Sequence, residues 1–159
     1  MCDQSGCPGG DSSFHETVTA AIGLAAFARA CHRNDALDAA VRAAELLLEH
    51  RLFRVGGHWP AIHPSWTVLR YPPYWRYDIL QGLRLLELLG LLGEDRATDA
   101  LNELQSMRRA DGRFSGRSWA SGVRPAAIDY GWGPANVMLN DRAAGLLAAW
   151  GRALSVATE

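Results

Sequence analysis

The sequence predicts an all-α protein built from antiparallel helical hairpins, with about five main helices. Ala and Leu together make up 46 of the 159 residues, whereas Ile and Val number only 11. Because Ala and Leu are strong helix formers and β-branched residues favour strands, this composition favours helices. Apolar residues also recur at intervals of three and four in several segments, which is typical of helices that pack one face on a core.

The first two expected helices form a hairpin over residues 14–54. Ser13 followed by Glu16 is a capping-box pattern, and it predicts a helix that starts here and runs to about Arg33. A polar break then separates this helix from a second one that begins at Ala36. The second helix has an apolar stripe that is expected to face the core, made of Leu37, Ala40, Val41, Ala44, Leu47 and Leu48.

A long ordered loop is expected between Arg54 and Tyr74. This segment contains two glycines and four prolines, which exclude a continuous helix. A second hairpin, over residues 74–114, is expected to follow it. Its first helix starts at about Tyr74 and ends at Gly90 or Gly93, and its apolar residues are Leu80, Leu83, Leu86 and Leu89.

The remaining elements complete the array. Asp95 is a suitable N-cap for the fourth helix, which ends before the Asp111-Gly112 turn. A glycine-rich irregular stretch over residues 113–133 precedes the fifth helix, which is expected from Pro134 to about Leu154.

An internal repeat connects these elements. Gly-Leu occurs at Gly23, Gly82 and Gly145, in the first, third and fifth expected helices, at intervals of 59 and 63 residues. The repeating unit is therefore a helical hairpin with a long loop, present as residues 14–54, 74–114 and a half unit 134–154. Stacked helical repeats bury faces that one unit cannot bury alone, so residues 14–154 are expected to form one helical-repeat domain after a flexible polar N-terminus at 1–13.

Charge and hydropathy exclude two classes of partner. The formal net charge is -1 and no basic stripe is present, so nucleic acid is not an expected partner. Charged and polar residues interrupt the longest apolar stretch, 79–92, so no transmembrane segment is expected. The N-terminus lacks the basic and apolar regions of a secretory signal, which favours a cytoplasmic location.

Three segments resemble the terpene cyclase and protein prenyltransferase superfamily, whose prenyltransferase and squalene-oxidase repeats form α/α toroids. Residues 13–18 (SFHETV) look like the start of an inner toroid helix, and residues 71–83 (YPPYWRYDILQGL) are the most specific match. Residues 100–114 are similar to the family's recurring Gln followed by Gly and an aromatic residue, here Phe114. The resemblance implies a partial α/α toroid and an isoprenoid-type ligand.

The chain also departs from the superfamily's pattern. The Asp-x-Asp-Asp motif with which squalene-type cyclases protonate their substrate is absent, so protonation by the usual acid is not expected. Protein prenyltransferases hold zinc with Asp, Cys and His, and the resemblance implies a zinc site at His15 with Cys2 or Asp3. The alternative is that His15 only packs at a helix start.

Aromatic residues crowd the segment before the third helix. Six of the 14 aromatic residues fall within 19 positions, and they are Trp59, Trp66, Tyr71, Tyr74, Trp75 and Tyr77. Aromatic faces stabilise cations and line apolar cavities, so Tyr71, Tyr74 and Trp75, with His15, are candidate ligand-binding residues. The alternative is that the aromatic residues pin a proline-rich loop to the helices by burial.

Two neighbouring residues are candidates for catalysis. Asp78, beside Tyr77, is placed to act as a general acid, or it complements the positive N-terminus of the third helix. The leading functional hypothesis is a terpene-cyclase-like or prenyltransferase-like domain that binds a hydrophobic small molecule in an aromatic-lined cavity. The alternative is a non-catalytic helical-repeat interaction or assembly module, for which a homo-oligomer is expected.

Overall fold

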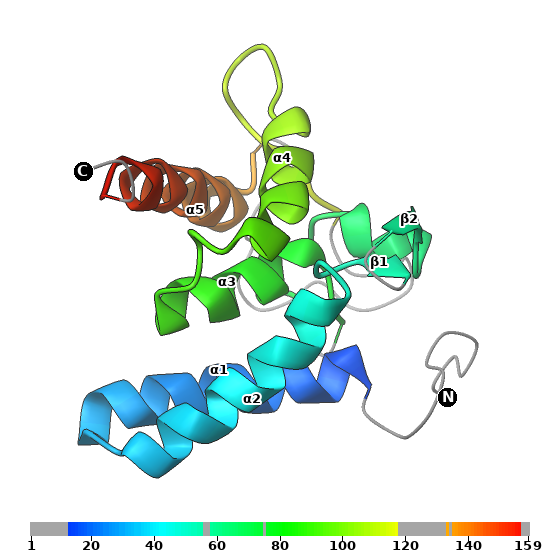
Figure 1. The fold of residues 1–159 in the computed structure, drawn as a ribbon. Helices are drawn as coiled ribbons and strands as arrows, with labels where there is room; N and C mark the ends of the chain where they lie inside the picture. The colour runs from blue at the N-terminus through cyan, green and yellow to red at the C-terminus, as the bar shows by residue number, and fades with distance from the viewer. Residues whose placement is uncertain (1–12, 56–57, 75, 118–132, 134, 157–159) are drawn as a thin grey trace.

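The computed structural model describes residues 13–55, 58–74, 76–117, 133 and 135–156, and the fold is all-α with five main helices, as the sequence predicts. The helices are α1 (Phe14–Cys31), α2 (Asn34–Glu49), α3 (Ile79–Leu89), α4 (Thr98–Ser106) and α5 (Val137–Val156) (Figure 1). None of the helices within these ranges has the length and apolar character needed to cross a membrane.

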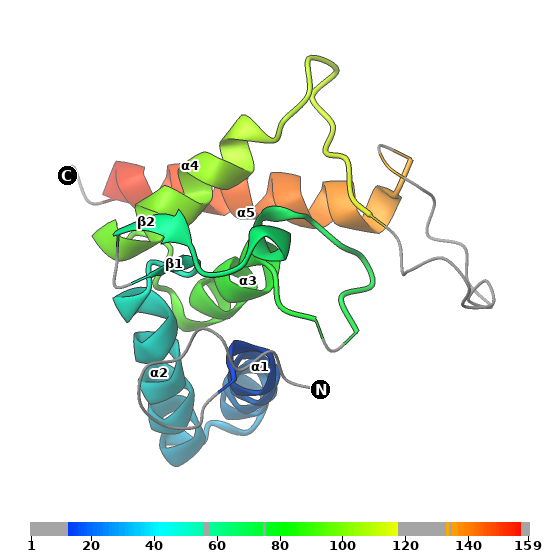
Figure 2. The same ribbon diagram turned by 90° about the vertical axis from the view of Figure 1, so that its right-hand side faces the viewer.

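Helix α3 is the centre of the packing. It contacts α1, α2, α4 and α5, and it lies between the α1–α2 hairpin and the α4–α5 pair in both views of the ribbon (Figures 1 and 2). In Figure 2, α1 is seen nearly end-on whereas α5 runs across the view, so the helix direction changes along the array. Seven of the eleven residues of α3 are buried: Ile79, Leu80, Gln81, Gly82, Leu83, Leu85 and Leu86.

The segment between the two hairpins has more regular structure than the expected loop. Strands β1 (Arg54–Val55) and β2 (His58–Ala61) form an antiparallel pair with Arg54 opposite Ala61. A 3-10 helix, η1 (Pro64–Thr67), follows, with proline in its first turn. A second 3-10 helix, η2 (Asp95–Ala97), leads into α4, so Asp95 begins a 3-10 turn rather than capping the α-helix.

The starts of α3 and α5 also differ from the expected positions. The third helix begins at Ile79 rather than Tyr74, because Asp78 is extended and caps the helix with its side chain, while Tyr74 has a left-handed φ of 49°. The fifth helix begins at Val137, where the Asn136 side chain accepts a hydrogen bond from the amide of Leu139. Pro134, the expected start, lies outside the described residues.

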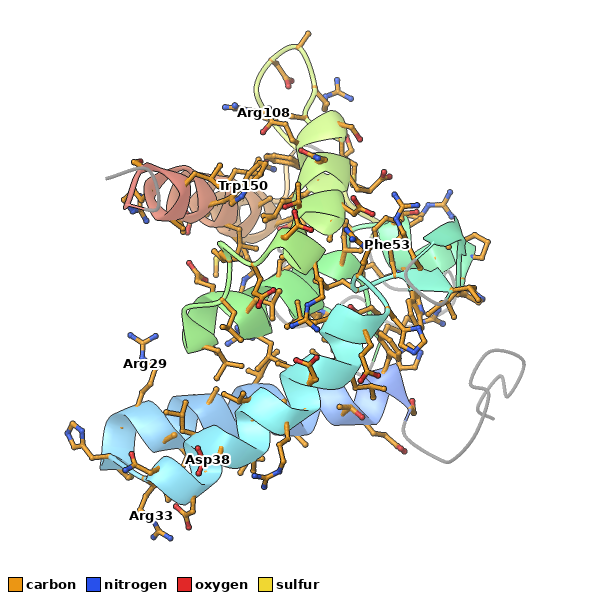
Figure 3. The ribbon with its side chains drawn as sticks, viewed as in Figure 1. Arg29, Arg33, Asp38, Phe53, Arg108 and Trp150 are labelled. Carbon is orange, nitrogen blue, oxygen red and sulfur yellow. The ribbon has the colours of Figure 1, made fainter. Side chains whose placement is uncertain are left out.

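The first hairpin departs from the sequence pattern in two details. Ser13 is the N-cap of α1, but its side chain makes no capping hydrogen bond, so the expected capping box does not form. The apolar stripe of α2 is wider than the face that packs on α1 and α3. Ala40 and Ala44 are fully buried, whereas Leu37 and Val41 remain exposed at its edge. Figure 3 shows charged side chains, among them Arg29, Arg33 and Asp38, projecting from this hairpin.

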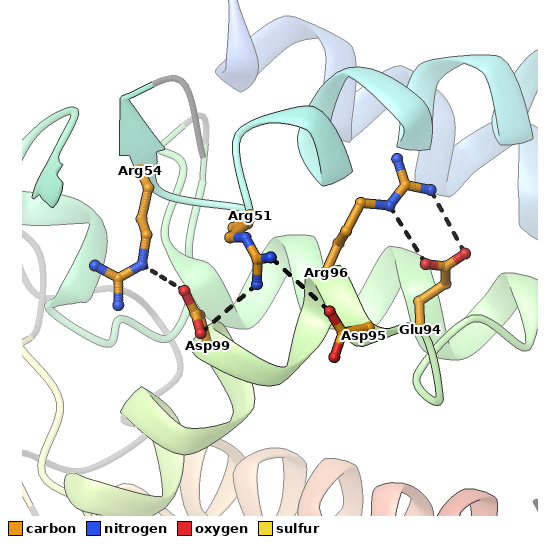
Figure 4. Close-up of polar contacts among 6 residues, drawn as sticks. All are labelled: Arg51, Arg54, Glu94, Asp95, Arg96 and Asp99. Atoms are coloured by element: carbon orange, nitrogen blue, oxygen red, sulfur yellow. Dashed lines mark hydrogen bonds and ion pairs between the residues drawn. The ribbon is translucent and has the colours of Figure 1, made fainter. Parts of the chain in front are cut away.

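Ion pairs connect the segment after α2 to η2 and to the start of α4 (Figure 4). Arg54 Nε lies 2.7 Å from Asp99 Oδ2, and Arg51 lies 3.8 Å from both Asp99 and Asp95. The Arg54 side chain is 12% exposed, so its bond to Asp99 is better shielded from water than an ordinary surface pair. Arg96 adds a second link, 2.5 Å from Glu45 of α2. These contacts fix α4 against the turn that follows α2.

The three repeated glycines have different surroundings, so the repeat does not reflect one structural need. A Cβ added at Gly82 would lie 2.5 Å from the Tyr77 hydroxyl and 2.9 Å from Leu52 Cδ2. At Gly23 and Gly145 a Cβ would meet nothing within 4 Å. Of these three glycines, only Gly82 is required by close packing.

We expect Gly82→Ala to lower the free energy of unfolding by about 1–3 kcal/mol, because overpacking forces the neighbouring side chains to move. The matched control is Gly23→Ala, on the exposed side of α1, which is expected to stabilise by about 0.5–1 kcal/mol through helix propensity. Urea denaturation of both variants measures the two effects. Equal effects of the two substitutions would show that the close approach at Gly82 does not contribute to the free energy of unfolding.

Candidate ligand-binding site

Long-range hydrogen bonds join the N-terminal ends of α1, α3 and α5. The amide of Tyr77 donates to Nδ1 of His15, at 2.6 Å, and this bond connects the start of α3 to the start of α1. The Asn136 side chain donates to the carbonyl of Tyr71, at 3.0 Å, and connects the start of α5 to the same loop. Three of the candidate residues, His15, Tyr71 and Tyr77, therefore lie near the N-terminal ends of these helices.

An aromatic cluster fills the junction between α1 and α3. The ring of Trp66 lies 4.6 Å from Phe14 and 4.7 Å from Tyr77, centroid to centroid, and Phe14 lies 5.3 Å from Tyr77. All three side chains are buried, and His15 touches the edge of the cluster. Rings in such close contact leave no room for a ligand, so here the aromatic residues anchor the loop by burial.

The side chain of Tyr77, a candidate catalytic residue, has a structural role. Its hydroxyl donates to the carbonyl of Leu52, at 2.8 Å, and the side chain is 1% exposed. Burial, with a smaller contribution from the charge of Asp78, raises the pKa of the Tyr77 hydroxyl well above its ordinary value. A neutral, fully packed hydroxyl bound to a backbone carbonyl holds the turn at Leu52 in place, where φ is 69°.

Asp78 caps α3 and fixes the preceding loop. One carboxylate oxygen accepts from the amide of Gln81, at 3.2 Å, and the other accepts from the amide of Arg70, at 3.0 Å. Burial raises the pKa of Asp78 to about 7, against these backbone donors and the nearby Arg70, which lower it. Because the carboxyl group is 1% exposed, the structure supports the capping role and offers no open path to a substrate.

The expected zinc site is only partly visible. Nδ1 of His15 accepts a hydrogen bond from the amide of Tyr77, so this ring nitrogen is not available to a metal. Cys2 and Asp3 lie outside the described residues. Within the part of the chain that the structure describes, no group of three His, Cys, Asp or Glu side chains is arranged to hold a metal ion. Zinc at His15 therefore stays a prediction.

Two of the remaining candidates, Tyr71 and Tyr74, have different surroundings. Tyr71 is half-buried, and the guanidinium of Arg142 lies over its ring, 5.7 Å from the centroid. Tyr74 is half-exposed on the loop, and Trp75 lies outside the described residues. Tyr71 thus contacts Arg142, which itself lines a groove between α3 and α5.

A shallow groove of about 220 Å³ lies between α3 and α5. Apolar side chains line part of it, and two arginines and two acids line the rest: Arg84, Glu87, Leu88, Met138, Asp141, Arg142, Gly145 and Leu146. The arginines are half-buried, whereas Glu87 and Asp141 are exposed at the rim. Burial and the charge of Arg142 lower the pKa of Arg84. We call this site the α3–α5 groove.

Sequence reasoning missed both arginines of the α3–α5 groove. The available signal was the position of Arg84, which interrupts the leucine-rich run of α3 between Leu83 and Leu85. An arginine in a helix that is otherwise buried is unusual, because its charge must be solvated or paired. Arg142 gave no such signal, since it lies next to Asp141 near the start of α5.

By its fold and groove the protein belongs to the class of all-α helical arrays. In its described residues an open amphipathic groove lies between α3 and α5, and a closed aromatic junction lies between α1 and α3. No protein-family model matches the chain, and no curated protein or solved structure is similar enough to count as a match.

Proposed function

We propose that this chain is a terpene-cyclase-like or prenyltransferase-like α/α-toroid domain that binds a short isoprenoid-type ligand in the α3–α5 groove. The observation that carries the proposal is the groove itself, in which the apolar side chains of Leu88, Met138 and Leu146 lie beside polar groups. Sites for small molecules combine an apolar lining with a few placed polar groups. At about 220 Å³ the groove suits a chain of one or two isoprene units better than a long polyprene.

The proposal is one of binding and includes no reaction. Tyr77 donates its hydroxyl proton to a backbone carbonyl, and Asp78 accepts from two backbone amides. Neither group faces the α3–α5 groove, whose lining comes from later turns of α3 and from α5. A general acid must reach the atom that it protonates, and these two side chains are closed off by packing.

We expect geraniol to bind the chain saturably, in titrations followed by isothermal calorimetry. Met138→Asn is expected to weaken the binding about tenfold, because it removes apolar contact from the groove. Val137→Asn is the matched control: Val137 is the next residue on α5, is 72% exposed and does not line the groove. No saturation at high micromolar geraniol, or equal weakening by both variants, contradicts the proposal.

A second candidate function is self-assembly, and the distribution of exposed apolar residues favours it. Among the helices described, Phe27, Leu37 and Val41 are exposed on the α1–α2 hairpin, and Val137, Met138 and Leu154 are exposed on α5. No exposed large apolar side chain lies on the described α3 or α4. Apolar surface is thus left at both ends of the array, as an open partial toroid requires. Light scattering distinguishes the candidates, since a monomer at high concentration argues against assembly.

A further inference from the structure

We propose that Arg84 and Arg142 form an oxyanion-binding site at the α3–α5 groove, so that its ligand is an amphipathic anion with a short apolar tail. This inference rests on the proposed function for the tail, while the anion site stands on the two arginines alone. The groove brings together one arginine from α3 and one from α5, which lie 58 positions apart in the sequence.

The two guanidinium groups form no direct ion pair in the described part of the chain. Neither Arg84 nor Arg142 forms an ion pair within 4.0 Å there, whereas Arg33, Arg51, Arg54, Arg96 and Arg109 each do. Glu87 and Asp141 line the same groove and are exposed, and neither comes within ion-pair distance of the arginines. The charge of Glu87 raises the pKa of Arg84, but its effect is smaller than the opposing effects of burial and of Arg142. The two half-buried guanidinium groups are therefore not ion-paired directly by the described residues.

The positive charges also oppose one another. Arg84 feels the charge of Arg142, which lowers its pKa in addition to the larger effect of burial. Two like charges held in a partly desolvated site are unfavourable, and an anion between them removes this repulsion. The protein maintains the pair through other contacts, since Arg142 lies over the ring of Tyr71, and Asn136 holds the Tyr71 carbonyl.

A buried donor that does not itself line the groove lies one turn earlier on α3. Gln81 is one helical turn before Arg84, and it is 4% exposed. Its Nε2 atom is buried and has no hydrogen-bond partner among the described residues. A buried amide nitrogen without an acceptor is costly, so this stripe of α3 carries more donors than the described residues satisfy.

The chemistry of these donors selects the ligand class. Guanidinium groups bind carboxylates and phosphates through paired N–H donors, and two of them suit a phosphate or a carboxylate head. The apolar wall of Leu88, Met138 and Leu146 then receives the tail. Gly145 widens the groove on the α5 side, because a Cβ there would meet nothing within 4 Å.

The test titrates the full chain with inorganic diphosphate, geranyl phosphate, geranic acid and geraniol, in low-salt buffer. Diphosphate is expected to bind saturably, and geranyl phosphate or geranic acid is expected to bind at least tenfold more tightly than geraniol. The tighter of the two anions identifies the head group as phosphate or carboxylate. Arg84→Gln and Arg142→Gln are each expected to weaken diphosphate binding at least tenfold, whereas Arg152→Gln, an exposed arginine of α5 outside the groove, has no effect.

The outcomes separate this inference from the proposed function. If geraniol binds but diphosphate does not, and neither geranyl phosphate nor geranic acid binds more tightly than geraniol, the anion site is overturned. The proposed function then stands. Binding of diphosphate without binding of geraniol supports the anion site and overturns the isoprenoid proposal. If Arg152→Gln weakens diphosphate binding as much as Arg84→Gln and Arg142→Gln do, the attraction depends on net charge alone, and the site is overturned. Circular dichroism on each variant verifies the fold, and Arg142→Lys, which keeps the charge, is expected to recover part of the affinity.

Discussion

Tyr77→Ala is expected to lower the free energy of unfolding by about 3–5 kcal/mol, the usual cost of truncating a large buried aromatic residue. The ring of Tyr77 packs on Phe14 of α1 and on Trp66 of the loop, so the substitution opens a cavity at the junction of three segments. It also removes the hydroxyl that donates to Leu52. Urea denaturation followed by circular dichroism measures the change, if the variant is still folded without denaturant.

Two further variants show whether the ring or the hydroxyl carries this effect. Tyr77→Phe keeps the ring and leaves the buried carbonyl of Leu52 without its donor, which is expected to cost about 1–3 kcal/mol. Tyr74→Ala, on the same loop but half-exposed, is expected to change stability by no more than about 0.5 kcal/mol. A Tyr77→Ala effect as small as that of Tyr74→Ala would contradict the cluster as the anchor of the loop.

The helices were predictable because each one carries a local signal. Leucines at helical spacing predict α3, and Gly90 ends it with a left-handed φ of 75°. The Asp111-Gly112 turn also forms where expected, with Gly112 at a φ of 80°. These signals depend on residues a few positions apart, so one sequence is enough to find them.

The start of α3 was not predictable in the same way, because contacts distant in sequence decide it. Asp78 is extended since its carboxylate binds the amide of Arg70, eight residues earlier, as well as capping the helix. The adjacent amide of Tyr77 binds His15, 62 residues away. Tyr74 to Tyr77 would continue a helix by local pattern, but these tertiary bonds fix the backbone differently.

The sequence directs attention to the segment that is richest in aromatic and polar groups. In the structure, Trp66 and Tyr77 of this segment belong to the packed junction, and the open groove lies on a later part of α3 and on α5. Whether a polar or aromatic side chain is packed or exposed depends on which helices meet, and local sequence patterns do not specify that. Arg84 and Arg142 become a pair only when α3 packs on α5.

Asp78 gives the fold a dependence on pH that a substitution can isolate. The pKa of an aspartate in an unfolded chain is about 3.9. In the folded protein, burial raises the pKa of Asp78 to about 7, despite its bonds to backbone amides. Between these values the folded state keeps a proton that the unfolded state releases. The stabilisation from this proton is complete below the unfolded pKa and is lost as the pH rises through about 7.

We therefore expect the free energy of unfolding to fall by about 3 kcal/mol between pH 5 and pH 8 through Asp78, since each pH unit below the folded pKa contributes about 1.4 kcal/mol. Asp78→Asn cannot titrate, so subtracting its urea-denaturation profile from that of the wild type removes the histidine contributions common to both. Asp38→Asn, on the exposed face of α2, is the matched control and is expected to keep the wild-type slope. A wild-type slope in Asp78→Asn would mean that the fall in stability does not come from Asp78. The carboxylate would then stay ionised in the folded protein, because the amides of Arg70 and Gln81 and the charge of Arg70 offset the cost of burial.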